Sequence, residues 1–152
     1  MNVVIAAVGK PRNAALAAAI AHYEERAARY WPLEVREVKE EGARASADVV
    51  KEKEGERLLA RTKGATVVAC DERGTSMTSP EFAAFLQAAR ERARDVAFVI
   101  GGAHGLAESV RATAQKRIAL APFTLPHELA RLVLAEQLYR AGTIVRGEPY
   151  HK

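Results

Sequence analysis

The chain has 152 residues, of which 49% are hydrophobic and 28% charged, which is enough to bury the core of one globular domain. No apolar run approaches the roughly 20 residues that a membrane-spanning helix needs, and Met1–Lys10 lacks the basic-then-apolar pattern of a signal peptide. The single cysteine, Cys70, excludes an internal disulfide and fits a reducing compartment. We therefore expect one cytoplasmic domain spanning residues 1–152, with no membrane segment.

The net charge of +4 is modest, and most of the excess lies in the last third of the chain. Residues 1–95 carry 16 basic and 15 acidic side chains, whereas residues 96–152 carry 7 and 4. A basic surplus usually serves solubility alone. Beside a binding site it is also compatible with the phosphates of an RNA partner.

Strand and helix patterns alternate along the first half of the chain. Val3–Val8 is a continuous apolar run, as in a strand buried on both faces, and Leu33–Val38 mixes apolar and charged residues like a more exposed strand. Asn13, a typical N-cap, and Pro32 bound a predicted helix between them. A charged helix is predicted over Ala47–Lys63 after a polar loop.

The same alternation continues in the second half. Thr66–Cys70 and Val96–Ile100 are short apolar runs typical of buried strands, and Ser79-Pro80-Glu81 is a helix start signal between them. A further strand is predicted over Arg117–Ala121, and a long helix over His127–Ala141. Strands that alternate with helices predict an α/β fold with a parallel sheet covered on both sides.

Three loops that follow predicted strands are the candidate binding region, because ligands of such sheets bind beyond the carboxyl ends of the strands. They are Asp71–Ser79, Gly101–Leu106 and Pro122–Pro126. The glycines of the second loop lack the spacing of a dinucleotide fingerprint, and there is no Walker sequence. They are equally compatible with a plain tight turn and with a backbone that approaches a neutral ligand such as a purine.

The four histidines show no metal-ligand spacing, so no metal site is predicted. We expect His22 and His104 to be exposed, and His127 to pack against the loop that precedes it. His151, in the terminal Tyr-His-Lys, could bind or deprotonate a substrate. A frayed chain end is the simpler alternative for it.

The last predicted helix is apolar around most of its circumference, which predicts a homodimer built around it. Arg131 shares its apolar stripe with Leu134 and Leu138 and therefore needs a carboxylate partner, for which a residue across the dimer interface is one candidate. Arg140 falls on the opposite, polar side of the helix. Cys70, at a strand end, is most simply a small core residue.

Several short motifs, spread over nearly the whole chain, together resemble one protein family. They are Ala7-Val8-Gly9-Lys10, Val99-Ile100-Gly101-Gly102-x-x-Gly105-Leu106, Thr124-Leu125-Pro126-His127, Glu136–Ala141 and the terminal Pro149-Tyr150-His151-Lys152. In this set the chain is similar to the ribosomal RNA large-subunit methyltransferase H family, which belongs to the SPOUT superfamily. The set is specific, although no single motif would be.

The resemblance implies an α/β fold whose C-terminal part, about residues 66–152, is tied in a trefoil knot that binds S-adenosylmethionine. It further implies a homodimer that methylates N3 of a pseudouridine in the 23S rRNA of the assembled ribosome. By matching position, the cofactor contacts would be Cys70, Gly101, Gly102, Leu120, Ala121, Pro122, Phe123, Thr124 and Leu125. Cys70 stands where we expect leucine in this family.

On this hypothesis the C-terminal residues face the RNA, because they offer phosphate contacts, a stacking ring and a titratable group. The candidate RNA-binding residues are Arg140, Arg146, Tyr150, His151 and Lys152, with His151 as the candidate base for the proton on N3. Two alternatives remain open: a non-catalytic ribosome-binding factor, and a SPOUT enzyme that methylates the ribose 2′-oxygen of transfer RNA.

Overall fold

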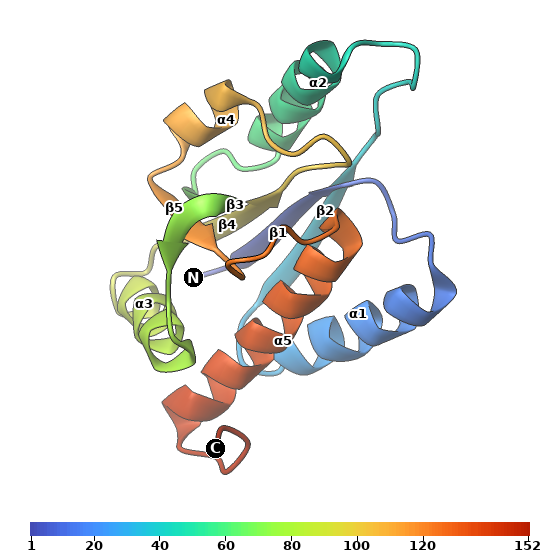
Figure 1. Ribbon diagram of the computed structural model, residues 1–152. Helices are drawn as coiled ribbons and strands as arrows, with labels where there is room; N and C mark the ends of the chain where they lie inside the picture. Colours follow the sequence, from blue (N-terminus) through green and yellow to red (C-terminus); the bar gives the residue numbers. More distant parts are fainter.

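The computed structural model describes all 152 residues, and its five strands form one fully parallel sheet (Figure 1). The strand order is β2-β1-β4-β3-β5. The strands are β1 (Val3–Val8), β2 (Leu33–Val38), β3 (Thr66–Ser76), β4 (Val96–Ile100) and β5 (Lys116–Ala119). The predicted parallel sheet is confirmed.

Helices cover both faces of the sheet, as predicted (Figure 1). The helices are α1 (Ala14–Ala27), α2 (Ala47–Ala60), α3 (Ser79–Glu91), α4 (Glu108–Thr113) and α5 (His127–Arg146). Alternate residues of a strand point to opposite faces, so Val3 and Ile5 pack with α1, α3 and α5, whereas Ala6 and Val8 pack with α2 and α4. None of the helices combines the length and hydropathy that crossing a lipid bilayer requires.

The order of the strands brings the binding loops together. β4 lies between β1 and β3, and all of its residues are buried, as are all of β1. On the side of β4 away from β1, β3 pairs with β4, and β5 pairs with β3 at the edge of the sheet. Because all strands are parallel, the loops after β3, β4 and β5 leave the sheet at one edge, beside the switch in strand order.

β3 departs most from the sequence-based expectation, which ended it at Cys70 and assigned the polar stretch after it to a turn. The strand continues to Ser76, with an irregularity between Cys70 and Thr75, after which Thr75 pairs with Ile118 of β5. At this irregularity the backbones of β3 and β5 are in contact: a Cβ on Gly74 would lie 2.7 Å from the carbonyl carbon of Arg117. Only glycine fits there without displacing β5.

The ends of several other elements also differ from the prediction, and α2 ends at Ala60, three residues earlier than expected. β5 begins at Lys116 and ends at Ala119, one and two residues earlier than expected. α5 continues past Ala141 to Arg146, because residues of its last turns still pack against the core. The N-cap of α3 is Thr78, whose side chain and that of Glu81 form a capping box, rather than Ser79.

The prediction that Arg131 pairs with a carboxylate across a dimer interface is wrong. The Arg131 guanidinium is buried within its own chain, where Nε lies 2.7 Å from Glu24 and Nη1 lies 3.0 Å from Glu37. Leu134 and Leu138 are fully buried in the core of the same chain. These residues of α5 therefore stabilise the fold of a single chain and are not evidence for a dimer.

Gly142 allows α5 to pack closely against Tyr30, in the turn that follows α1, because a Cβ at Gly142 would overlap the Tyr30 side chain. Two contacts hold Tyr30 in place. Glu148 accepts a hydrogen bond from its hydroxyl group, and the Arg146 guanidinium lies 4.5 Å from its ring centre. Alanine usually stabilises a helix interior by up to about 1 kcal/mol over glycine. Here we expect Gly142→Ala to lower the free energy of unfolding by about 1–3 kcal/mol in urea denaturation, the typical cost of overpacking.

Gly42→Ala is the matched control, because no atom lies within 4 Å of a Cβ at Gly42 and its backbone is not left-handed. Its unfolding midpoint should stay close to that of the unmodified protein. A Gly142→Ala protein as stable as this control would contradict the steric account of the contact between Gly142 and Tyr30.

Candidate active site

A cavity of about 620 Å³ opens at the carboxyl ends of β3, β4 and β5. Its walls come from the three loops that the sequence singled out. They include eight of the nine predicted cofactor positions, namely Cys70, Gly101, Gly102, Leu120, Ala121, Phe123, Thr124 and Leu125, while Pro122 lies outside the lining. The structure thus brings these residues together, and their role as cofactor contacts stays a prediction.

The Gly101–Leu106 loop is a tight turn and also a wall of the cavity, so the two interpretations of its glycines are compatible. A Cβ on Gly101 would lie 2.6 Å from the carbonyl carbon of Gly105, and Gly105 has a φ of +82°. The Gly105 N–H donates to the Gly102 carbonyl at 3.0 Å. The N–H groups of Gly101, Ala103, His104 and Leu106 have no acceptor within the chain, which leaves donors for a ligand.

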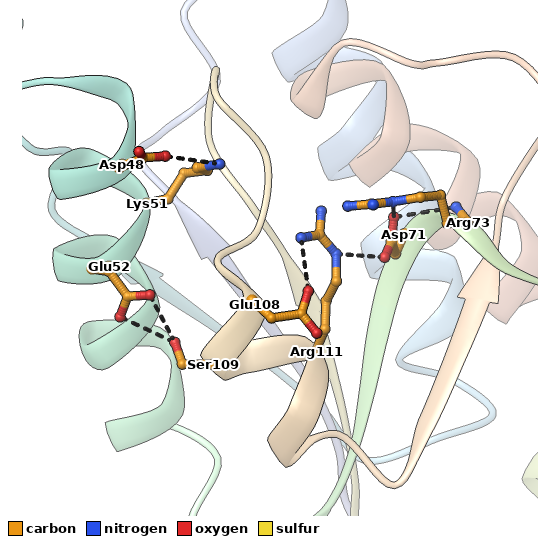
Figure 2. Close-up of polar contacts among 8 residues, drawn as sticks. All are labelled: Asp48, Lys51, Glu52, Asp71, Arg73, Glu108, Ser109 and Arg111. Atoms are coloured by element: carbon orange, nitrogen blue, oxygen red, sulfur yellow. Dashed lines mark hydrogen bonds and ion pairs between the residues drawn. The ribbon is translucent and has the colours of Figure 1, made fainter.

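An ion pair forms another part of the cavity wall. Figure 2 shows Asp71, in the bulged part of β3, between Arg73 and Arg111 of α4. Asp71 Oδ2 accepts a hydrogen bond from Arg111 Nε at 2.6 Å, and Oδ1 accepts one from the Arg73 N–H at 3.2 Å. Arg111 is also 3.7 Å from Glu108, one turn earlier in α4. This network fixes the end of β3 to α4.

Arg111 is the one lysine or arginine that lines the cavity, and sequence reasoning did not find it. It lies on a short helix without a motif, and its importance comes from Asp71, which is distant in the sequence. Burial alone would raise the pKa of Asp71, but its hydrogen bonds with the Arg73 N–H and the Arg111 guanidinium outweigh this and hold the pKa below its usual value. Asp71 is therefore ionised at neutral pH.

We expect Arg111→Met to reduce the free energy of unfolding by about 3–5 kcal/mol at pH 7, because it leaves the Asp71 carboxylate buried without its partner. A carboxyl whose pKa is lowered by folding contributes stability above its unfolded pKa of about 3.9, and that contribution is lost as the pH falls. The deficit of Arg111→Met should therefore shrink below about pH 4, as urea denaturation at several pH values would show.

Arg73→Met is the control for this prediction. Its side chain is 68% exposed and its Nε is 4.0 Å from Asp71, so we expect a change of less than about 1 kcal/mol. Equal effects of the two substitutions would show that the buried geometry of Arg111 does not matter.

Cys70 is a partly buried residue that packs against the core and also lines the cavity. Burial raises the pKa of its thiol to about 12, so the thiol stays protonated at neutral pH and is not a nucleophile. This agrees with the interpretation of Cys70 as a small core residue. No group of three or more His, Cys, Asp or Glu side chains is placed to hold a metal ion.

The predicted RNA-binding residues gather around the last turns of α5, and the tail folds back on that helix. The Tyr150 hydroxyl donates to Glu136 at 2.9 Å, and the Arg140 guanidinium lies 4.7 Å from the Tyr150 ring centre. Arg140 Nη1 is 3.2 Å from His151 Nδ1, which must be the acceptor because arginine only donates. The tail is thus ordered through Tyr150 and not frayed, while His151 and Lys152 are exposed.

Burial and the hydrogen bond to Glu136 raise the pKa of the Tyr150 hydroxyl above its usual value, so this group is no base at neutral pH. Arg146 contacts the turn after α1, where it donates to the Arg29 carbonyl at 3.1 Å. His22 and His104 are exposed, as expected, and His127 lines the cavity beside the Pro122–Pro126 loop.

The cavity lies at the first turn of α5, whereas the tail follows the last turn of this helix and folds back beside it. Figure 1 shows the course of α5 and the C-terminus after it. His127 and Ala130, in the first turn, line the cavity, whereas the tail begins after Arg146. His151 contacts Arg140, which is ten residues beyond Ala130, or about 15 Å along the helix. The structure therefore does not bring the candidate base His151 to the cavity of its own chain.

Known proteins share the sequence pattern and the fold of this chain. Residues 1–151 match the family model described as a predicted SPOUT methyltransferase. A probable methylase family protein from Haemophilus influenzae Rd KW20 has a TM-score of 0.56 at 14% identity, over 99% of this chain and 70% of that one. The A. aeolicus TrmH/SpoU tRNA modifying enzyme has a TM-score of 0.52 at 14% identity, over 96% of this chain and 77% of that one. At such identities the likeness concerns the fold alone.

Two relatives with much higher identity carry the same name, ribosomal RNA large subunit methyltransferase H. The protein of Gemmatimonas aurantiaca is 64% identical, and that of Anaeromyxobacter dehalogenans strain 2CP-C is 48% identical, each over 100% of both chains. The chain belongs to the ribosomal RNA large subunit methyltransferase H family.

Proposed function

We propose that this protein transfers a methyl group from S-adenosylmethionine to N3 of a pseudouridine in the 23S rRNA of the large ribosomal subunit. The observation that carries the proposal is the cavity at the carboxyl ends of β3, β4 and β5, which gathers eight of the nine residues expected to hold the cofactor. The relatives of this chain are named for methylation of large-subunit RNA, which supports the substrate class.

The cavity fits a ligand of the size and chemistry of S-adenosylmethionine. Its volume of about 620 Å³ is within the usual range for such sites. Leu106, Leu120 and Ala130 supply apolar surface for a purine, and the free N–H groups of the glycine loop supply donors. Arg111 balances the charge of Asp71, so Glu72 leaves one net negative charge on the wall, which suits a cationic sulfonium ligand. S-adenosylmethionine would supply an activated methyl group.

The chain's own residues then have three tasks: to align the acceptor nitrogen with the methyl group, to exclude water, and to receive the proton of N3. We propose His151 for the last task. In the folded-back tail its Nδ1 accepts from Arg140, so Nδ1 becomes free when Arg140 turns to an RNA phosphate. Arg146, Tyr150 and Lys152 would contact the RNA beside it.

We further propose a homodimer, because His151 lies about 15 Å along α5 from the cavity of its own chain, and the cavity of a partner is the alternative site for the tail. Leu129, Leu132 and Val133 of α5 belong to neither core cluster nor its packed surroundings, and the nearby Phe123 is 80% exposed. A second chain that covers this apolar surface would remove it from water.

Leu129→Lys combined with Val133→Lys should therefore produce monomers that still fold. Light scattering at micromolar concentration would separate the two states. A monomer in the unmodified protein would contradict the proposed dimer. The trefoil knot expected from the family is also a proposal.

Incubation with methyl-labelled S-adenosylmethionine and purified large subunits, whole ribosomes or transfer RNA tests the proposed function. We expect label in the 23S rRNA of the ribosomal samples. Cofactor binding without transfer to any RNA would support the non-catalytic ribosome-binding factor instead. Label in transfer RNA would support the ribose methyltransferase.

A further inference from the structure

Glu54 is a buried carboxylate behind the glycine loop, and one of its oxygens has no partner. The residue lies on α2 and is 4% exposed. Oε2 accepts a hydrogen bond from the Glu41 N–H at 3.0 Å, whereas Oε1 has no hydrogen-bond partner. A buried acceptor without a donor raises the free energy of the folded state, so such an oxygen calls for an explanation.

The free oxygen faces the loop that forms the cavity wall. Oε1 lies 2.8 Å from the position that a Cβ on Gly102 would occupy, and Gly102 separates Glu54 from the cavity. Four N–H groups of this loop have no acceptor within the chain, those of Gly101, Ala103, His104 and Leu106. An unpaired buried acceptor and unpaired donors thus belong to adjacent segments at the edge of the site.

We propose that Glu54 is a positioning residue for the cofactor: its free oxygen accepts a hydrogen bond from an N–H of the Gly101–Leu106 loop when the cofactor is bound. A small shift of the loop suffices to pair the two sets of groups. The bond fixes Gly102 against the ligand while Glu54 itself stays outside the cavity. This inference rests on the proposed function, because it takes S-adenosylmethionine as the occupant of the cavity.

A carboxylate is needed for this role because it has two oxygens that both accept. Oε2 is committed to the Glu41 N–H, and Oε1 takes the N–H of the loop. Glutamine has a single acceptor oxygen, so Glu54→Gln would set an NH2 group against one of the two donors. If Glu54 only filled space in the fold, the neutral glutamine would serve equally well or better, because it is less costly to bury than a charge.

Titration calorimetry with S-adenosylmethionine tests the proposal. Glu54→Gln should bind the cofactor at least about tenfold more weakly, the loss expected for one charge-assisted hydrogen bond, while its unfolding midpoint stays within a few degrees. Glu56→Gln is the matched control, since it makes the same change at an exposed position of α2 and should bind normally. In hydrogen exchange, the cofactor should protect the amides of the loop in the unmodified protein but much less in Glu54→Gln.

Every result of these binding measurements either supports or contradicts the role of Glu54. Unchanged affinity in Glu54→Gln, with the unmodified protein binding the cofactor, overturns the role of Glu54 and leaves the proposed function intact. No binding by the unmodified protein overturns both. If Glu54→Gln does not fold, Glu54→Asp keeps the charge but withdraws it by one methylene group; normal affinity in that variant overturns the role, and a tenfold loss supports it.

Discussion

Gly101→Val is expected to abolish binding of S-adenosylmethionine and, with it, methyl transfer. The first atom of a side chain at Gly101 would lie 2.6 Å from the carbonyl carbon of Gly105 and 3.0 Å from the Leu106 nitrogen. The two methyl groups of valine add further bulk, so the tight turn must open and the cavity loses one wall. We expect the affinity measured by calorimetry to fall at least about 100-fold, beyond the loss of a single hydrogen bond.

The fold should survive this substitution, because the clash is confined to a loop on the cavity wall. Gly42→Val is the control, since the space around Gly42 is open and the residue does not line the cavity. Its cofactor affinity and unfolding curve should match those of the unmodified protein. Retained affinity in a folded Gly101→Val protein would count against this cavity as the cofactor site.

Deletion of Gly147–Lys152 should reduce methyl transfer to ribosomes by orders of magnitude while cofactor affinity stays within a few-fold of normal. The cavity is at the other end of α5, so the deletion leaves its walls intact. Several contacts with RNA, worth about 1–3 kcal/mol for each stacked base, would be lost together. Transfer assays on ribosomes and calorimetry with the cofactor measure the two effects separately.

Two point variants separate the roles of the tail. Tyr150→Phe keeps the ring beneath Arg140 and removes only the hydrogen bond to Glu136, so it should transfer methyl groups at close to the normal rate. His151→Ala should lower the rate at saturating ribosome concentration if His151 receives the proton of N3. Near-normal turnover by the truncated protein would show that the tail is only an ordered chain end.

The sequence predicts the sheet and the loops well because both depend on local patterns. The continuous apolar runs Val3–Val8 and Val96–Ile100 are typical of strands covered on both faces, and each is fully buried. The loops after the strands had to meet at one edge of a parallel sheet. The extension of β3 could not be predicted, because Asp71–Gly74 has the composition of a turn and continues as strand only through its pairing with β5.

The features that were missed or wrong depend on contacts between distant residues. The apolar stripe shows that Arg131 needs a carboxylate, but not that Glu24 and Glu37, on α1 and β2, provide it within one chain. Glu54 belongs to a helix that reads as a solvated charged face, and only the fold places it behind Gly102. Arg111 was missed for the same reason, since its partner Asp71 is on another element.

Nucleoside mass spectrometry of 23S rRNA, from a strain that lacks this protein and from the same strain with it restored, tests the central claim most directly. The account predicts that N3-methylpseudouridine is absent without the protein, returns with the unmodified chain, and does not return with Gly101→Val. An unchanged N3-methylpseudouridine content in the strain without the protein, or loss of a ribose-methylated nucleoside instead, would contradict it.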